Sequence, residues 1–162
     1  MDKITLRSMT SVYFVRDNEI LCLFRIGSKV ADKLFVGAAG GHFEEEELND
    51  PEACVLREMR EELGLEGKDI YDLKLRYITH RLKNGEIRQN YYFFAKLIGE
   101  APLQSTEGIL RWVHMEGSGE LPMPVSAKHM MMHYLEHGRF TETVYAGITE
   151  EAGTNFIPLT EF

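Results

Sequence analysis

Three carboxylates lie close together in the segment REMREELGL, residues 57–65. An α-helix turns by about 100° per residue, so Glu58, Glu61 and Glu62 fall at relative angles of about 0°, 300° and 40°, on one arc of a helix. Like charges at this spacing repel one another. Such a cluster is either a solvated helix surface or the oxygen-rich site that a hard divalent cation prefers.

Two glycines, Gly40 and Gly41, precede the acidic cluster. The conformational freedom of glycine allows a turn here that brings a backbone carbonyl oxygen beside the carboxylates. Carbonyl and carboxylate oxygens together are suitable ligands for a divalent cation. The combination therefore favours a metal site over a purely solvated surface.

A helix is predicted from Pro51 to Leu63. Asp50 can accept hydrogen bonds from the first free N–H groups, Pro51 suits the first turn, and Gly64 ends the helix. A second face of this helix, separate from the acidic one, is apolar and predicted to face the core. It carries Leu56, Met59 and Leu63.

The segments around this helix predict β-strands. Residues 9–16 and 19–26 read as a hairpin, and residues 73–82 and 86–97 read as a second hairpin around the Asn84-Gly85 turn. A further strand is expected to start at residue 34 and to end at the glycines that follow. Strands are also expected at 109–115 and 143–148, and a helix at 125–138.

No linker or repeat divides the chain, so residues 1–162 are expected to form one α+β domain, with a mixed sheet and a helix on either side. The formal net charge is -8, which disfavours binding of a nucleic-acid polymer. No secretory signal or membrane-spanning run is apparent, and two cysteines are too few for a disulfide framework. These features predict a cytoplasmic protein with no membrane partner.

The acidic segment resembles the signature of the Nudix hydrolases: Gly, five residues, Glu, seven residues, then Arg-Glu-aliphatic-any-Glu-Glu-any-Gly-aliphatic. Residues 57–65 match the second half at every specified position, and Gly41 and Glu47 match the first half. Nine residues separate Glu47 from Arg57, so the loop is two residues longer than the family pattern. Either Glu44 or Glu47 can then be the first glutamate.

The resemblance implies a Nudix-like α/β/α sandwich with a mixed central sheet. It also implies hydrolysis of a nucleoside diphosphate linked to another group, with Mg²⁺ or Mn²⁺ neutralising the phosphates. The ligands that it assigns to the metal are the Gly41 carbonyl region and the carboxylates of Glu58, Glu61 and Glu62.

For catalysis, the resemblance gives Arg57 the task of orienting a loop glutamate through a bidentate pair. The general base is either Glu58 or Glu107, which lies in a later loop five residues before Trp112. Arg25 is the preferred candidate for contacting the substrate phosphates, ahead of Lys29 and Lys33.

The RWV and LPMP segments and the helix after them resemble MutT-type members of the family. Such members cleave nucleoside triphosphates, including oxidised purine nucleotides, to a monophosphate and pyrophosphate. The alternatives are hydrolysis of a nucleotide sugar or another diphosphate, isomerisation of isopentenyl diphosphate, and a non-catalytic domain that senses a ligand. The expected partner is a small nucleotide, and both a monomer and a homodimer remain open.

Other notable side chains are predicted to be structural. Residues 91–94 place aromatic rings on both faces of one strand, and Trp112 is expected to pack. Cys22 and Cys54 are expected to be small buried hydrophobes. His129, His133 and His137 recur at every fourth position and are expected to form a surface stripe.

Overall fold

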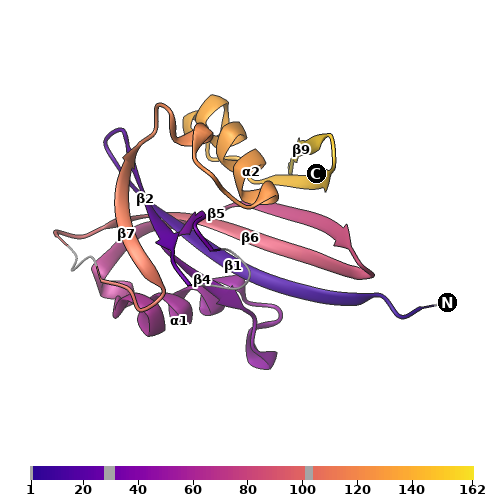
Figure 1. Ribbon diagram of the computed structural model, residues 1–162, viewed down its shortest axis with the longest axis horizontal. Helices are drawn as coiled ribbons and strands as arrows, with labels where there is room; N and C mark the ends of the chain where they lie inside the picture. The colour runs from indigo at the N-terminus through magenta and orange to yellow at the C-terminus, as the bar shows by residue number, and fades with distance from the viewer. Residues whose placement is uncertain (1, 28–31, 101–103) are drawn as a thin grey trace.

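The structure, a computed structural model, describes residues 2–27, 32–100 and 104–162. In these ranges nine strands form one sheet, and the helices α1 (Pro51–Leu63) and α2 (Val125–Glu136) lie on its two sides (Figure 1). The strands are β1 (Thr5–Arg16), β2 (Glu19–Arg25), β3 (Phe35–Gly37), β4 (Ala39–His42), β5 (Ile70–Lys83), β6 (Glu86–Leu97), β7 (Gly108–His114), β8 (Tyr145–Glu150) and β9 (Gly153–Pro158).

The main path of the sheet runs β3-β2-β1-β6-β5-β8-β9, while β4 pairs with β1 and β7 pairs with β2. The pairs β1–β6 and β5–β8 are parallel, and the other pairs are antiparallel. The sheet is therefore mixed and carries one helix on each side. The predicted α+β class and α/β/α sandwich are confirmed.

Helix α1 has the predicted limits because both of its ends are capped. The side chain of Asp50 accepts a hydrogen bond from the N–H of Ala53 at 3.0 Å, and Pro51 occupies the first turn. Gly64 adopts a left-handed conformation with φ of 69°, and its N–H donates to the carbonyl oxygen of Arg60. These caps set the helical phase that gathers the carboxylates on one arc.

Two hydrophobic cores hold the helices against the sheet. One core joins Val55, Met59 and Leu63 of α1 to Val12 and Phe93. The other core joins α2 to the opposite face, where its members are Tyr13, Tyr77, Tyr92, Phe94, Met130, Met131 and Tyr134. The rings of residues 92–94 thus lie on both faces of β6, and burial of these large side chains stabilises both layers.

The sequence predicted that the strand starting at residue 34 breaks at the glycines. In the structure, β3 is instead followed directly by β4, which contains Gly40 and Gly41. Gly41 pairs with Thr10 of β1, and Gly40 pairs with Ser11. A Cβ atom at Gly40 would lie 2.2 Å from the Thr10 carbonyl oxygen. Only glycine allows this approach, so Gly40 lets the strand pair closely with β1.

Two other expectations differ from the structure. The strand predicted at 143–148 is β8, and it is followed by a strand that was not predicted, β9, which pairs with it in an antiparallel hairpin. The histidines of α2 do not form a surface stripe. His133 Nδ1 lies 2.8 Å from the Tyr77 hydroxyl, and His129 Nδ1 lies 2.8 Å from Thr154 Oγ1, so both rings pack inward.

The remaining structural expectations hold. Cys22 and Cys54 are both free and buried. Trp112 is half-buried beside the α1-side core, and the Arg16 guanidinium lies 3.8 Å from the centre of its ring. Within the described ranges, every helix is too short or too polar to span a lipid bilayer.

Candidate active site

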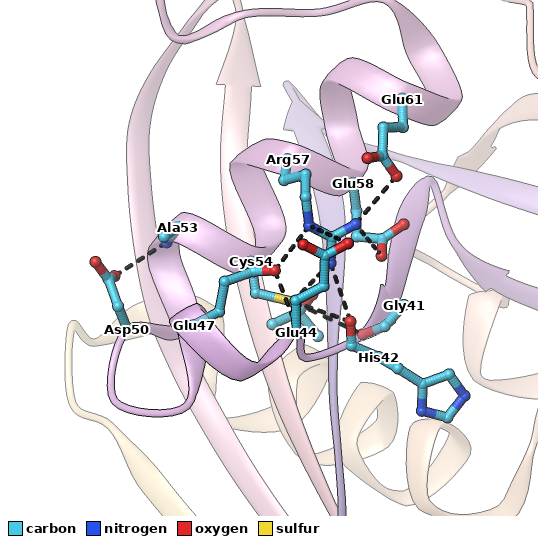
Figure 2. A network of polar contacts seen from close by, with 11 residues as sticks. Gly41, His42, Glu44, Glu47, Asp50, Ala53, Cys54, Arg57, Glu58 and Glu61 are labelled. Atoms are coloured by element: carbon cyan, nitrogen blue, oxygen red, sulfur yellow. Dashed lines mark hydrogen bonds and ion pairs between the residues drawn. The ribbon is translucent and has the colours of Figure 1, made fainter.

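The guanidinium of Arg57 joins a loop, helix α1 and strand β4. Its Nε donates to Glu47 Oε1 at 2.7 Å, and its Nη2 donates to the carbonyl oxygen of His42 at 3.0 Å. Its Nη1 donates to Glu58 at 2.9 Å and to Glu61 at 3.0 Å (Figure 2). Arg57 does hold a loop glutamate, but the predicted bidentate pair is not formed because its donors are divided among three carboxylates.

The geometry separates the two candidates for the first glutamate of the signature. The Glu47 side chain is only 8% exposed, whereas that of Glu44 is 58% exposed and its carboxylate lies 3.7 Å from Arg57 Nε. The short 3-10 helix η1 (Glu45–Glu47) takes up part of the longer loop and turns Glu47 inward. Glu47 is thus the loop carboxylate that Arg57 orients.

Gly41 lies directly against the carboxylate of Glu58. A Cβ atom at Gly41 would be 2.4 Å from Glu58 Oε1, so a side chain at this position fits only if the Glu58 carboxylate moves. The predicted turn at these glycines is absent; strand β4 itself brings its backbone against this helical carboxylate. Carbonyl and carboxylate oxygens are available side by side.

The third helical carboxylate, Glu62, accepts a hydrogen bond from the N–H of Gly40 at 3.2 Å. The pKa of Glu62 is raised to about 7, chiefly by burial and also by the nearby charges of Glu58 and Glu107, while the Gly40 bond and Arg25 lower it. Carboxylates crowded in this way gain from a bound cation, which favours their ionised form.

A cavity of about 340 Å³ opens beside Glu62 and is lined at this end by Arg25, Gly40, Glu62 and Glu107. Arg25 Nη2 donates to Glu107 Oε2 at 3.3 Å, across 82 residues of sequence. Arg25 Nε is buried and has no hydrogen-bond partner in the part of the chain that the structure describes. A buried donor of this kind suits a bound anion.

The structure thus sorts the predicted site residues into two adjoining groups. Arg57, Glu58 and Glu61 form one group, with Gly41 against Glu58. Arg25, Glu62 and Glu107 form the other group and line the cavity. The groups adjoin because Gly40, which bonds to Glu62, precedes Gly41 in β4. Glu58 and Glu61 are not part of the cavity wall. Of the remaining cations, Lys33 is exposed away from the cavity, and Lys29 lies outside the described residues.

Sequence reasoning missed the far wall of this cavity. That wall is built from alternate positions of β5 and β6 and from the start of α2, namely Arg81, Lys83, Arg88, Asn90, Tyr92 and residues 124–127. The signal was present, because residues two apart on a strand share a face. A larger cavity of about 550 Å³, near Arg76 and Arg139, contains none of the predicted site residues.

The candidate ligands fit a hard divalent cation in chemistry, since all of them are oxygen donors. Glu47 Oε2 is also buried, without a hydrogen-bond partner among the described residues. Over those same residues, no three His, Cys, Asp or Glu side chains already converge as a ligand cluster. Arg57 contacts Oε1 of Glu58 and Oε2 of Glu61, so each carboxylate has a second oxygen that is not used in this contact.

Replacing Gly41 with alanine is expected to displace the Glu58 carboxylate and to weaken Mn²⁺ binding by about 10- to 100-fold. Calorimetric titration with Mn²⁺ measures this effect. Gly67→Ala is the matched control, because a Cβ atom there meets open space. Equal Mn²⁺ affinity in the two variants would show that the contact between Gly41 and Glu58 does not form the metal site.

The raised pKa of Glu62 predicts a pH-dependent stability in the metal-free protein. The protonated form is favoured in the fold, so its stabilisation is full below the ordinary pKa of 4.5 and is lost as the pH rises through about 7. Glu62→Gln should remove this loss, as measured by urea unfolding between pH 4 and 8. The exposed Glu45→Gln is the control, and parallel profiles for wild type and Glu62→Gln would contradict the assignment.

Known structures share the arrangement of these elements. A MutT protein from Bacillus halodurans superposes with a TM-score of 0.66 at 23% identity, over 95% of each chain. A NUDIX hydrolase from Nitrosomonas europaea gives 0.69 at 14% identity, over 89% of this chain and 78% of its own. A MutT NUDIX hydrolase from Burkholderia pseudomallei gives 0.61 at 23% identity, over 82% and 97%. These likenesses show a common fold.

A search among curated proteins gave no match. The family profile of the NUDIX domain, in contrast, matches residues 5–134, which include the whole Arg57 network and most of α2. This range covers most of the chain and agrees with the signature at residues 57–65. The chain therefore belongs to the Nudix family, whose hydrolases act on phosphoric anhydrides.

Proposed function

We propose that the protein is a metal-dependent pyrophosphohydrolase of nucleoside diphosphate derivatives. Its preferred substrate class is a purine nucleoside triphosphate, including oxidised forms, which it cleaves to a monophosphate and pyrophosphate. The metal is Mg²⁺ or Mn²⁺, and the protein acts in the cytoplasm on a small nucleotide. Two free, buried cysteines are in keeping with a reducing compartment.

One observation carries this proposal. The carboxylates of α1 and the backbone of Gly41 adjoin a cavity whose near end holds Arg25, Glu62 and Glu107. An acidic centre next to a buried arginine suits a substrate whose phosphates need both a cation and a guanidinium. The cavity volume of about 340 Å³ lies in the range of small-molecule sites.

Each group has a separate task in the proposed reaction. Glu58, Glu61 and Glu62, with the Gly41 carbonyl, hold the cation, which neutralises the phosphates when it is bound. Arg57 holds Glu47, Glu58 and Glu61 in place. Arg25 leaves its contact with Glu107 to bind a substrate phosphate. Water adds to one phosphorus as the bridging P–O bond breaks, and a general base accepts the proton of that water.

Glu107 is the proposed general base. Glu58 is 11% exposed in its side chain and is held by Arg57, whereas Glu107 is 43% exposed and lies in the cavity wall. A base must reach the attacking water, which favours the carboxylate that faces the substrate space. Glu58 then acts chiefly as a metal ligand.

Removal of the metal is expected to reduce hydrolysis to background, because phosphates and carboxylates cannot otherwise approach each other. The assay scores pyrophosphate, phosphate and isomerised product over a panel of nucleoside triphosphates, oxidised purine nucleotides, nucleotide sugars and isopentenyl diphosphate. Mg²⁺ or Mn²⁺ should restore the activity after chelation. Undiminished turnover in metal-free buffer would contradict the proposed site, and no turnover on any substrate would leave a ligand-sensing domain.

Glu107→Gln should lower turnover by about 10²- to 10⁴-fold while leaving the affinity for Mn²⁺ unchanged, because a positioned base contributes an effect of this size. Glu58→Gln should weaken Mn²⁺ binding as well as turnover. Metal affinity and steady-state rate are measured separately for each variant, with Glu45→Gln as the exposed control. Wild-type behaviour of Glu107→Gln, combined with loss of turnover in Glu58→Gln, would return the role of base to Glu58.

A further inference from the structure

Three arginines form a row across adjacent strands at the outer end of the sheet. Arg7 of β1 is the register partner of Arg88 of β6, and Arg88 is the register partner of Arg81 of β5. Register partners lie side by side on the same face of a sheet. Lys83 follows Arg81 by two positions and shares that face. We call Arg81, Lys83 and Arg88, the members that line the cavity, the distal basic cluster.

The fold supplies little negative charge to this row. Glu86 lies 2.8 Å from Arg88 Nε and 3.8 Å from Arg7 Nε, and these contacts hold the pKa of Glu86 below its usual range. Within the described ranges, neither Arg81 nor Lys83 has a carboxylate within 4.0 Å. Like charges directly opposite one another destabilise a sheet, so the row has a charge that a bound anion would balance.

The other end of the same two strands is built differently. There Lys74 of β5 and Lys96 of β6 share the carboxylate of Asp72, at 3.0 Å and 3.4 Å, and Lys74 also contacts Glu142. Cations at that end are matched by carboxylates, as expected where the charges serve only the fold. Arg76, in the middle of β5, donates instead to the carbonyl oxygens of Gly138, Thr141 and Thr143. Among the described residues, Arg81 and Lys83 are therefore the cations of these two strands that have neither kind of partner, and both line the cavity.

The cavity connects the distal basic cluster to the acidic centre. Its wall includes Glu62, Glu107 and Arg25 at one end and Arg81, Lys83 and Arg88 at the other. Asn90, Tyr92 and the first residues of α2 line the space between these ends. A ligand with its anhydride near Glu62 would therefore extend toward the distal basic cluster with its nucleoside part.

We infer that Arg81, Lys83 and Arg88 form a subsite for a second anionic group, a phosphomonoester on the ribose of the substrate. Within the proposed substrate class, nucleotides that carry an additional 2′- or 3′-phosphate then bind more tightly than those without it. Arginine suits this role because its planar donors match phosphate oxygens in a bidentate manner. The inference rests on the proposed function for the position of the anhydride, but binding at the subsite needs no turnover.

The test uses three ligands that differ by one phosphate: AMP, adenosine 2′,5′-bisphosphate and adenosine 3′,5′-bisphosphate. Calorimetric titration in the presence of Mg²⁺ at low salt should show that at least one bisphosphate binds roughly tenfold more tightly than AMP. This ratio corresponds to one charge-assisted hydrogen bond. In the double variant Arg81→Gln, Arg88→Gln, the ratio should fall to about one.

Lys96→Gln is the matched control, because it removes one positive charge from the same hairpin at the opposite end. It should keep the wild-type ratio. Thermal melting verifies that each variant is folded. If the double variant does not fold, the single variant Arg81→Gln is used instead, because its replacement breaks no ion pair within the described residues. The ratio of affinities should then fall to roughly half or less of the wild-type ratio.

Equal affinity of the wild-type protein for all three ligands overturns the subsite. So does a preference for a bisphosphate that survives in the folded variant. Because these ligands contain no anhydride, either result leaves the proposed hydrolysis untouched. Failure of all three ligands to bind also overturns the subsite, and the substrate panel then decides the hydrolysis separately.

Discussion

The contact on which the site depends is the division of one guanidinium among four acceptors. Arg57 binds carboxylates from the loop and from helix α1, and it binds the carbonyl oxygen of His42 at the end of β4. Its side chain is only 15% exposed, so these charge-assisted bonds are partly shielded from water. They fix the position of α1 relative to β4, and with it the distance between the helical carboxylates and the glycine backbone.

The glycines of β4 make this arrangement sterically feasible. At Gly40 a side chain would collide with β1, and at Gly41 it would collide with Glu58. Strand pairing and the approach to the helix are therefore both satisfied at two adjacent positions that carry no Cβ atom. Gly41 is also the position at which β4 lies closest to the carboxylate of Glu58.

The two ends of the cavity differ in the charge of their side chains. The chain is acidic overall, with a net charge of -8, yet the cations of the distal basic cluster gather at one end of the cavity and the carboxylates at the other. At the acidic end, burial and neighbouring carboxylates raise the pKa of Glu62. Both ends are incompletely neutralised by the protein itself, and complementary charges on a ligand or cation would relieve each of them.

The sequence by itself determined the features that depend on near neighbours. Capping by Asp50 and Gly64 gave the limits of α1, the Asn84-Gly85 turn gave the β5–β6 hairpin, and helical phase placed the carboxylates on one arc. These predictions succeeded because caps, turns and helical periodicity act over a few residues.

Only the tertiary structure decided which distant segments meet. The parallel pairing of β1 with β6 places Arg7 beside Arg88, and the path of β7 beside β2 brings Glu107 to Arg25. The sequence left Glu44 and Glu47 as alternatives, because the loop is two residues longer than the signature. The fold buries Glu47 beside Arg57 and leaves Glu44 exposed. Strand pairing over long sequence separations depends on the packing of the whole sheet, so no local pattern specifies it.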